Sequence, residues 1–255
     1  MGEQILHKMK ETSKSISAVI PTYNEAENIK IIIDRVEDTL KGISDDIELI
    51  IVDDSSPDGT ALIAREYNKK YGNIKVIVRK KKAGIGAALK EGYNNAKNEL
   101  IVSTDADFHF DPEDMLNLFR KLDKGYDLVV GSRYKSNHKY KKKGVKNKIK
   151  SVLSTMGNVG MRTISGVPMY DFSANFRAMR KKVWDKIKVK DNDNSMLFEM
   201  IIKAHYSGFK VSNVPIHFRD RIYGNSKLNI YKEASRFLYK LSYHSFKIRI
   251  LKKMR

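Results

Sequence analysis

Two aspartates that follow a short apolar run are the residues of this sequence best placed to do chemistry. The apolar residues 100–102 precede Asp105 and Asp107, and His109 continues the same alternation. Side chains at i and i+2 of a strand leave it on the same face, so the two carboxylates are expected to converge. Two carboxylates with a third ligand beside them suit a hard divalent cation that keeps positions open for phosphate oxygens. The pattern therefore predicts a metal-diphosphate site.

These acids also have a purely structural interpretation, in which they cap the helix that begins near Pro112. However, Asp111 and Pro112 already form a good N-cap and first-turn pair for that helix. The earlier acids are not needed for capping, which favours the metal interpretation.

Short apolar runs alternate with helical patterns, which predicts an α/β fold with a mostly parallel central sheet and helices on both faces. In such sheets ligands bind outside the carboxyl ends of the strands. Polar side chains follow the predicted strands at those ends and would face one crevice. The predicted strands are 17–20, 47–52, 74–78, 100–102 and 128–130, the predicted helices are 29–40, 61–71, 87–97, 113–121 and 149–164, and the polar residues are Tyr23, Glu25, Asp53, Asp54, Asp105, Asp107 and Arg133.

Some of these residues have simpler explanations. One of Asp53 and Asp54 is expected to serve a turn or a helix cap. Gly84 and Gly86, between a strand and a helix, are similar to a dinucleotide-binding fingerprint. That fingerprint normally follows the first strand and carries a third small residue, which is only approximated here. We therefore expect the glycines to form a tight turn whose amides approach a phosphate or a base.

Composition limits the function classes further. The chain of 255 residues has a formal net charge of +19 and no cysteine, so thiol chemistry is excluded and attraction to polyanions is expected. A non-catalytic nucleic-acid-binding protein fits the charge, but the sequence has no recognisable recognition helix or stacking platform, and that function would leave the acids unexplained. The polar residues 1–15 lack a secretory signal core, and no apolar stretch approaches the about 20 residues that span a bilayer. We expect a soluble or peripheral protein.

Taken together and in order, the motifs resemble those of family 2 glycosyltransferases, and within them the dolichol-phosphate mannosyltransferase (polyprenol-phosphate hexosyltransferase) group. The resemblance covers residues 16–228, which we expect to form one catalytic domain. It implies a GT-A fold, a nucleotide-sugar donor, Mg or Mn as cofactor, and inversion at the anomeric carbon. The matching stretches are Ile20-Pro21-Thr22-Tyr23-Asn24-Glu25, Val52-Asp53-Asp54-Ser55-Ser56-Pro57-Asp58, Gly84-Ile85-Gly86-Ala87-Ala88, Asp105-Ala106-Asp107 and Gly131-Ser132-Arg133-Tyr134.

The resemblance also implies roles for individual residues. His109 stands where many relatives have Gln as a further metal ligand, and an imidazole there is softer and would shift preference towards Mn. By this carry-over the donor is bound by Pro21, Tyr23, Glu25, Val52, Asp54, Ala106 and Asp107, the metal by Asp105, Asp107 and His109, and the acceptor by Arg133, Asp171, Ser173 and Arg177; the catalytic set is Asp105, Asp107, Arg133, Arg221 and Lys227, the last two closing over the diphosphate.

The implied reaction transfers a hexose, with mannose from GDP-mannose as the family default, to a dolichyl or polyprenyl phosphate. A UDP-sugar with another acceptor is the alternative. A phosphate acceptor is already anionic and needs alignment more than a base, whereas a hydroxyl acceptor would need a carboxylate base, for which Asp171 is the candidate.

The basic residues 229–255 have apolar positions at helical spacing, which predicts an amphipathic helix. Such a helix lies either in a membrane interface or against the catalytic domain. Because the acceptor is a membrane lipid, we expect a cytoplasmic protein that is peripheral at the cytoplasmic face of a membrane, either by this helix or through an integral membrane partner.

Overall fold

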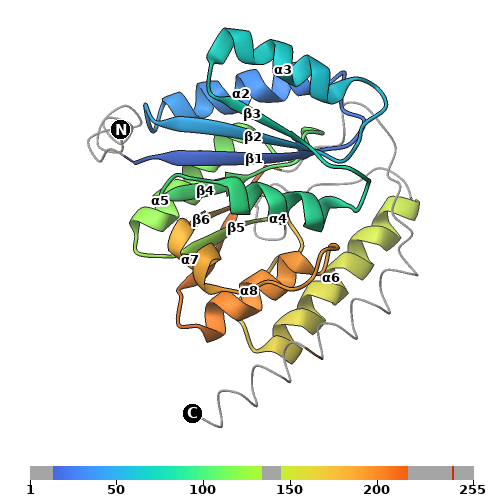
Figure 1. Cartoon of the computed structure of the whole chain (residues 1–255). Coiled ribbons are helices and arrows are strands. Elements are labelled where there is room, and N and C mark those ends of the chain that lie inside the picture. Colours follow the sequence, from blue (N-terminus) through green and yellow to red (C-terminus); the bar gives the residue numbers. More distant parts are fainter. Residues whose placement is uncertain (1–13, 134–144, 218–242, 244–255) are drawn as a thin grey trace.

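Strands and helices alternate through the first half of the chain, and the second half completes the same sheet. The computed structural model describes residues 14–133, 145–217 and Tyr243. Figure 1 shows the helices packed around a central sheet. The elements are β1 (Ile16–Thr22), α2 (Ile29–Lys41), β2 (Ile47–Asp53), α3 (Thr60–Tyr71), β3 (Ile74–Val78), α4 (Ile85–Asn95), β4 (Leu100–Ser103), the 3-10 turn η1 (Pro112–Asp114), α5 (Met115–Asp123), β5 (Leu128–Ser132), α6 (Val145–Ser165), β6 (Arg177–Arg180), α7 (Lys181–Lys186), α8 (Met196–Tyr206) and β7 (Val211–Pro215).

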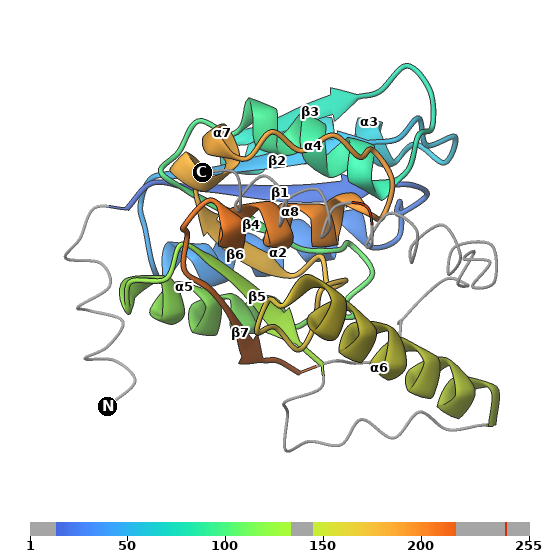
Figure 2. The same ribbon diagram turned by 90° about the horizontal axis from the view of Figure 1, so that it is seen from below.

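Within the described residues the sheet has seven strands in the order β3-β2-β1-β4-β6-β5-β7. Neighbouring strands are parallel except at β6, which is antiparallel to both β4 and β5. Seen from below in Figure 2, α2 and α5 lie on one side of the sheet, and α4 and α7 lie on the other. The prediction of a mostly parallel α/β sheet flanked by helices on both faces is confirmed.

The core forms where apolar strands meet the apolar faces of the helices. β1, β2 and β4 are buried along almost their whole length, as expected of central strands covered on both faces. Helix α2 turns Ile29, Ile32, Ile33, Val36 and Leu40 inward at helical spacing, and each is fully buried. Burial of one such side chain contributes about 1.5–3 kcal/mol. This rigid centre fixes the positions from which the strand-end loops leave.

The predicted strands are all present, with small differences at their ends. The helix expected over 113–121 is divided into η1 and α5, and Asp111 caps it as predicted, because its side chain accepts the amide of Glu113. β6, α7 and β7 were not predicted. No helix in the part of the chain that the structure describes is long and apolar enough to cross a membrane. Apart from Tyr243, the predicted helix over 229–255 lies outside the described residues, as do residues 1–13 of the predicted N-terminal segment.

Candidate active site

The loop that follows β4 carries the two aspartates with which the sequence analysis began. β4 ends at Ser103, so Asp105 and Asp107 lie in the loop and the argument from strand alternation does not apply to them. Asp105 accepts a hydrogen bond of 2.8 Å from the side-chain amide of Asn175. Phe108 adopts a left-handed backbone (φ 58°) and is buried. The loop is therefore held by a hydrogen bond on one side and a buried ring on the other.

Asp107 and His109 lie close together in this loop. The Asp107 carboxylate accepts the main-chain amide of His109 at 3.2 Å, and its other oxygen lies 3.7 Å from the His109 Nε2 atom. Both side chains keep some exposure, 11% for Asp107 and 24% for His109. Among the described residues there is no group of three or more His, Asp or Glu side chains already arranged around a metal position. The donor set fits a cation bound by two or three protein ligands whose other ligands come from a substrate.

Asp53 and Asp54, at the end of β2, have different hydrogen-bond partners. Asp53 is fully buried and accepts from the Thr22 hydroxyl and from the amide and hydroxyl of Ser56. Asp54 accepts from Arg79 at 2.8 Å and from the amides that follow Lys82, those of Ala83 and Gly84, at 2.7–3.1 Å. One of the pair was expected to serve a turn, and the structure shows this for both. Asp53 binds the loop after β2, and Asp54 binds the loop between β3 and α4.

The loop between β3 and α4 lies next to the loop that follows β1. Its Lys82 ammonium lies 3.3 Å from the centre of the Tyr23 ring. Gly84 has a φ of 90°, which favours glycine, and its amide is bound by Asp54 instead of facing a phosphate. Gly86 is needed for a different reason, because a Cβ there would overlap the main-chain carbonyl of Asp193. These contacts explain both glycines without a dinucleotide.

Other residues predicted to bind the donor are placed as follows. Glu25 accepts a 2.7 Å hydrogen bond from Asn28, and its amide donates to the Thr60 hydroxyl. Pro21 is half-buried within β1, and Ala106 is buried in the β4 loop. Val52 is fully buried in the core, so its side chain serves packing.

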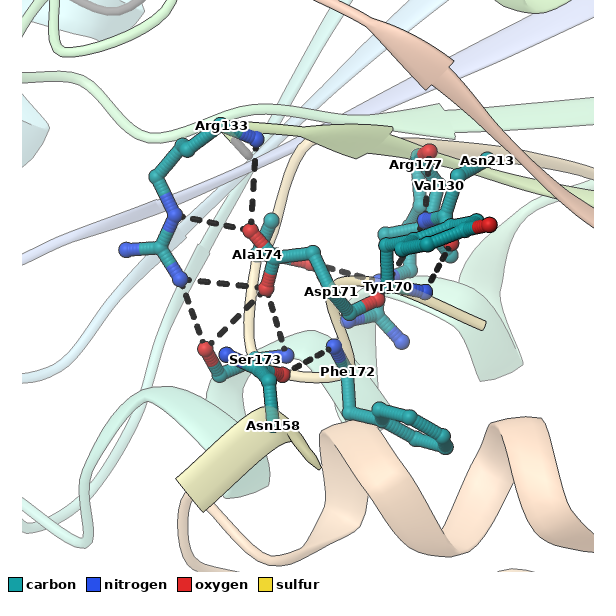
Figure 3. A network of polar contacts seen from close by, with 10 residues as sticks. All are labelled: Val130, Arg133, Asn158, Tyr170, Asp171, Phe172, Ser173, Ala174, Arg177 and Asn213. Atoms are coloured by element: carbon teal, nitrogen blue, oxygen red, sulfur yellow. Dashed lines mark hydrogen bonds and ion pairs between the residues drawn. The ribbon is translucent and has the colours of Figure 1, made fainter. Parts of the chain in front are cut away.

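Three of the four residues predicted to bind the acceptor are bonded to one another in the network drawn in Figure 3. Asp171 is fully buried and pairs with Arg133 through two hydrogen bonds, from Nε at 2.8 Å and from Nη2 at 3.0 Å. Arg133 Nη2 also donates to the Ser173 hydroxyl at 2.8 Å. The Arg133 side chain is 24% exposed. The structure therefore brings Arg133, Asp171 and Ser173 together. The buried Asp171 carboxylate orients the Arg133 guanidinium.

Arg177, the fourth of these residues, has different partners. It is 1% exposed, and its guanidinium donates to the main-chain carbonyls of Ala174 and Leu197. Burial lowers the pKa of Arg177, and the carboxylates of Asp171 and Asp105 oppose that shift. The structure does not support a direct contact between Arg177 and an acceptor; its bonds hold the segment between α6 and β6.

Three asparagines that sequence reasoning missed also hold this part of the site: Asn175 in that segment, Asn158 in α6 and Asn213 in β7. Asn175 binds Asp105, while Asn158 and Asn213 bind the main chain around Asp171. Such asparagines carry no sequence signal that separates these bonds from those of an ordinary polar position, so only the fold could identify them. Arg221 and Lys227, predicted to close over the diphosphate, lie outside the described residues.

Comparison with known proteins agrees with the family resemblance. The model of the family described as Glycosyl transferase family 2 matches residues 17–188. The chain is 35% identical over 214 residues to the dolichol-phosphate mannosyltransferase of Pyrococcus furiosus, across 84% of this chain and 59% of that protein. It is 34% identical over 218 residues to the polyprenol monophosphomannose synthase of Mycolicibacterium smegmatis, across 83% of this chain and 80% of that protein.

Solved structures give the same fold at low sequence identity. The glucosyl-3-phosphoglycerate synthase of Mycobacterium tuberculosis, in complex with Mn²⁺, UDP and phosphoglyceric acid, superposes with a TM-score of 0.68 and 16% identity. That superposition covers 96% of this chain and 82% of the other. The same enzyme was also crystallised with Mg²⁺ and UDP, again with a TM-score of 0.68. At this identity the likeness concerns the fold, which is that of GT-A glycosyltransferases.

Proposed function

We propose, from the premise that this chain belongs to glycosyl transferase family 2, that it transfers mannose from GDP-mannose to a dolichyl or polyprenyl phosphate with inversion. The names of the two relatives described above support the acceptor class and the sugar. The chain spans 59% of the Pyrococcus furiosus protein and 80% of the Mycolicibacterium smegmatis protein. Neither name specifies the nucleotide, and we propose GDP because GDP-mannose is the family default.

The observation that carries this proposal is the buried ion pair between Arg133 and Asp171. A hydroxyl acceptor would require a carboxylate that can reach it and take its proton. Asp171 is fully buried and accepts hydrogen bonds from Arg133 and Ser173, which leaves it poorly placed for that role. A phosphate monoester is anionic at neutral pH and needs only a positioned cation. Arg133, oriented by Asp171 and still 24% exposed, fits that requirement.

On the donor side, we propose that a divalent cation is held by Asp107 and His109 with Asp105. The fold neighbours crystallised with Mn²⁺ or Mg²⁺ support this, as does the distance of 3.7 Å between the Asp107 carboxylate and the His109 ring. When bound, such an ion neutralises charge on the departing diphosphate. The residues of the chain contribute in a different way. Asn175 keeps Asp105 in place, and Arg221 and Lys227 are proposed to add positive charge near the leaving group.

The proposed acceptor class implies that the protein works at a membrane. A polyprenyl chain lies in the bilayer, so the phosphate is reached at the headgroup level. We propose that residues 229–255 form the surface contact at the cytoplasmic face, since their lysines and arginines would be attracted to anionic lipid. An integral membrane partner is the competing means of approach.

The test is a donor screen on the purified full chain with a short polyprenyl phosphate, with and without Mn²⁺. We expect transfer from GDP-mannose that depends on the cation, and a fall of at least about 10³-fold for Asp107→Ala without loss of fold. His109→Gln, which restores the commoner family residue, should retain activity. Asp185→Ala is the matched control, because Asp185 is an exposed acid paired with Lys181 on α7. Transfer from UDP-glucose alone would change the donor, and activity in Asp107→Ala would refute the metal assignment.

A further inference from the structure

The Arg133–Asp171 pair depends on a segment that has no helix or strand of its own. Residues 166–176, between α6 and β6, are irregular, so their main-chain polar groups must be satisfied by side chains or water. Asn158 of α6, itself buried, accepts the amide of Phe172 at 2.9 Å. Asn213 of β7 accepts the amide of Tyr170 at 2.6 Å and donates to the carbonyl of Asp171 at 3.3 Å. The main chain on both sides of Asp171 is thereby fixed.

Asn213 is also bonded to the strand that carries the other partner. Its side-chain amide donates to the carbonyl of Val130 in β5 at 3.0 Å, and β5 ends at Ser132, directly before Arg133. In Figure 3, Asn213 and Val130 are drawn on the other side of Asp171 from the Arg133 guanidinium. One side chain therefore joins the main chain that presents the carboxylate to the main chain that presents the cation.

We propose that Asn213 is a positioning residue for the acceptor step, which acts by fixing Asp171 relative to Arg133 and so fixes the direction of the guanidinium. This rests on the proposed function, in which Arg133 binds the acceptor phosphate. Rate and affinity at such a contact depend steeply on position, since a displacement of about 1 Å costs up to about 10²-fold.

The chemistry of the amide makes Asn213 hard to replace. Its side-chain NH2 group donates to the carbonyls of Val130 and Asp171, and its side-chain oxygen accepts the amide of Tyr170. Alanine loses all three bonds. Aspartate keeps the acceptor for Tyr170 but loses both donors, and it brings a carboxylate against two carbonyl oxygens. Both substitutions should therefore loosen the link between β5 and the segment around Asp171.

The experiment compares Asn213→Ala and Asn213→Asp with Asn73→Ala in the full chain. Asn73 is the matched control, because its amide likewise donates to a strand carbonyl, that of Ile47 at 3.1 Å, but at the opposite ends of the strands. Acceptor KM and kcat are measured with a short polyprenyl phosphate, donor affinity with GDP by calorimetry, and folding by thermal unfolding. We expect the Asn213 variants to raise acceptor KM about tenfold with GDP affinity unchanged, and Asn73→Ala to change acceptor KM less than about twofold.

A wild-type acceptor KM in a folded Asn213 variant would overturn the proposal. So would equal losses of acceptor and GDP affinity, or an equal effect of Asn73→Ala, because each would indicate a general loss of stability. If Asn213→Ala does not fold, Asn213→Asp supplies the measurement. A wild-type chain that transfers no sugar to any polyprenyl phosphate would instead refute the proposed function.

Discussion

Replacing Asp171 with asparagine tests whether the acceptor arginine is held by a buried ion pair. The change keeps the shape of the side chain but removes its charge beneath Arg133, where it accepts two hydrogen bonds of 2.8 and 3.0 Å. Removal of one partner of a fully buried pair costs about 3–5 kcal/mol. Because the Arg133 side chain is 24% exposed, water recovers part of that loss. We therefore expect Asp171→Asn to lower the free energy of unfolding by about 3 kcal/mol.

The assay is urea unfolding of a double-mutant cycle made of Asp171→Asn, Arg133→Met and the double variant. We expect a coupling energy of about 2 kcal/mol, since the second substitution removes the charge that the first leaves unpaired. Asp185→Asn is the control, because its pair with Lys181 is 56% exposed on the carboxylate side and should contribute less than about 1 kcal/mol. Effects of Asp171→Asn and Arg133→Met that add within about 0.5 kcal/mol would refute the ion-pair argument.

Gly86→Ala should destabilise by about 1–3 kcal/mol in urea unfolding, because the new methyl group would overlap the Asp193 carbonyl, whereas Gly157→Ala on α6, with open space around it, should be neutral or stabilise by up to about 1 kcal/mol. Asp58→Asn should flatten the loss of stability below about pH 4. Burial alone would raise the pKa of Asp58, but hydrogen bonds from Thr60 and from the amide of Ala26 lower it from 3.8. The contribution of Asp58 to the free energy of unfolding is therefore present above that value and is lost as the pH falls through the folded-state pKa. An unchanged acid limb in Asp58→Asn would contradict this. Removal of residues 229–255 should sharply reduce co-sedimentation with anionic liposomes at low salt, and equal sedimentation of the shortened chain would exclude this segment as the membrane contact.

Periodicity and motif order were sufficient to predict the sheet and most of its strands, because short apolar runs that alternate with helical patterns are typical of a mostly parallel α/β sheet. β6 was missed because its residues, Arg177 to Arg180, begin and end with arginine, and the burial of Arg177 follows only from its main-chain partners. β7 was missed because its polar edge-strand positions include Asn213. A fully buried arginine carries no sequence signal that separates it from a surface arginine, so its role was assigned wrongly to acceptor contact.

The site residues that sequence motifs highlight divide into two kinds, and burial separates them. Asp53, Asp54 and Asp171 are at most 3% exposed, and the carboxylate of each accepts several hydrogen bonds from its own chain. A buried charge without such partners would be strongly destabilising, so these acids fix loops. Asp107 and Arg133 retain exposed atoms on the loops so fixed. Reactive groups on loops gain precision when neighbouring buried charges hold the backbone, since little reorganisation is then needed when the substrate binds. Substitution of Asp53, Asp54 or Asp171 should therefore lower both stability and activity, whereas substitution of Asp107 should lower activity alone.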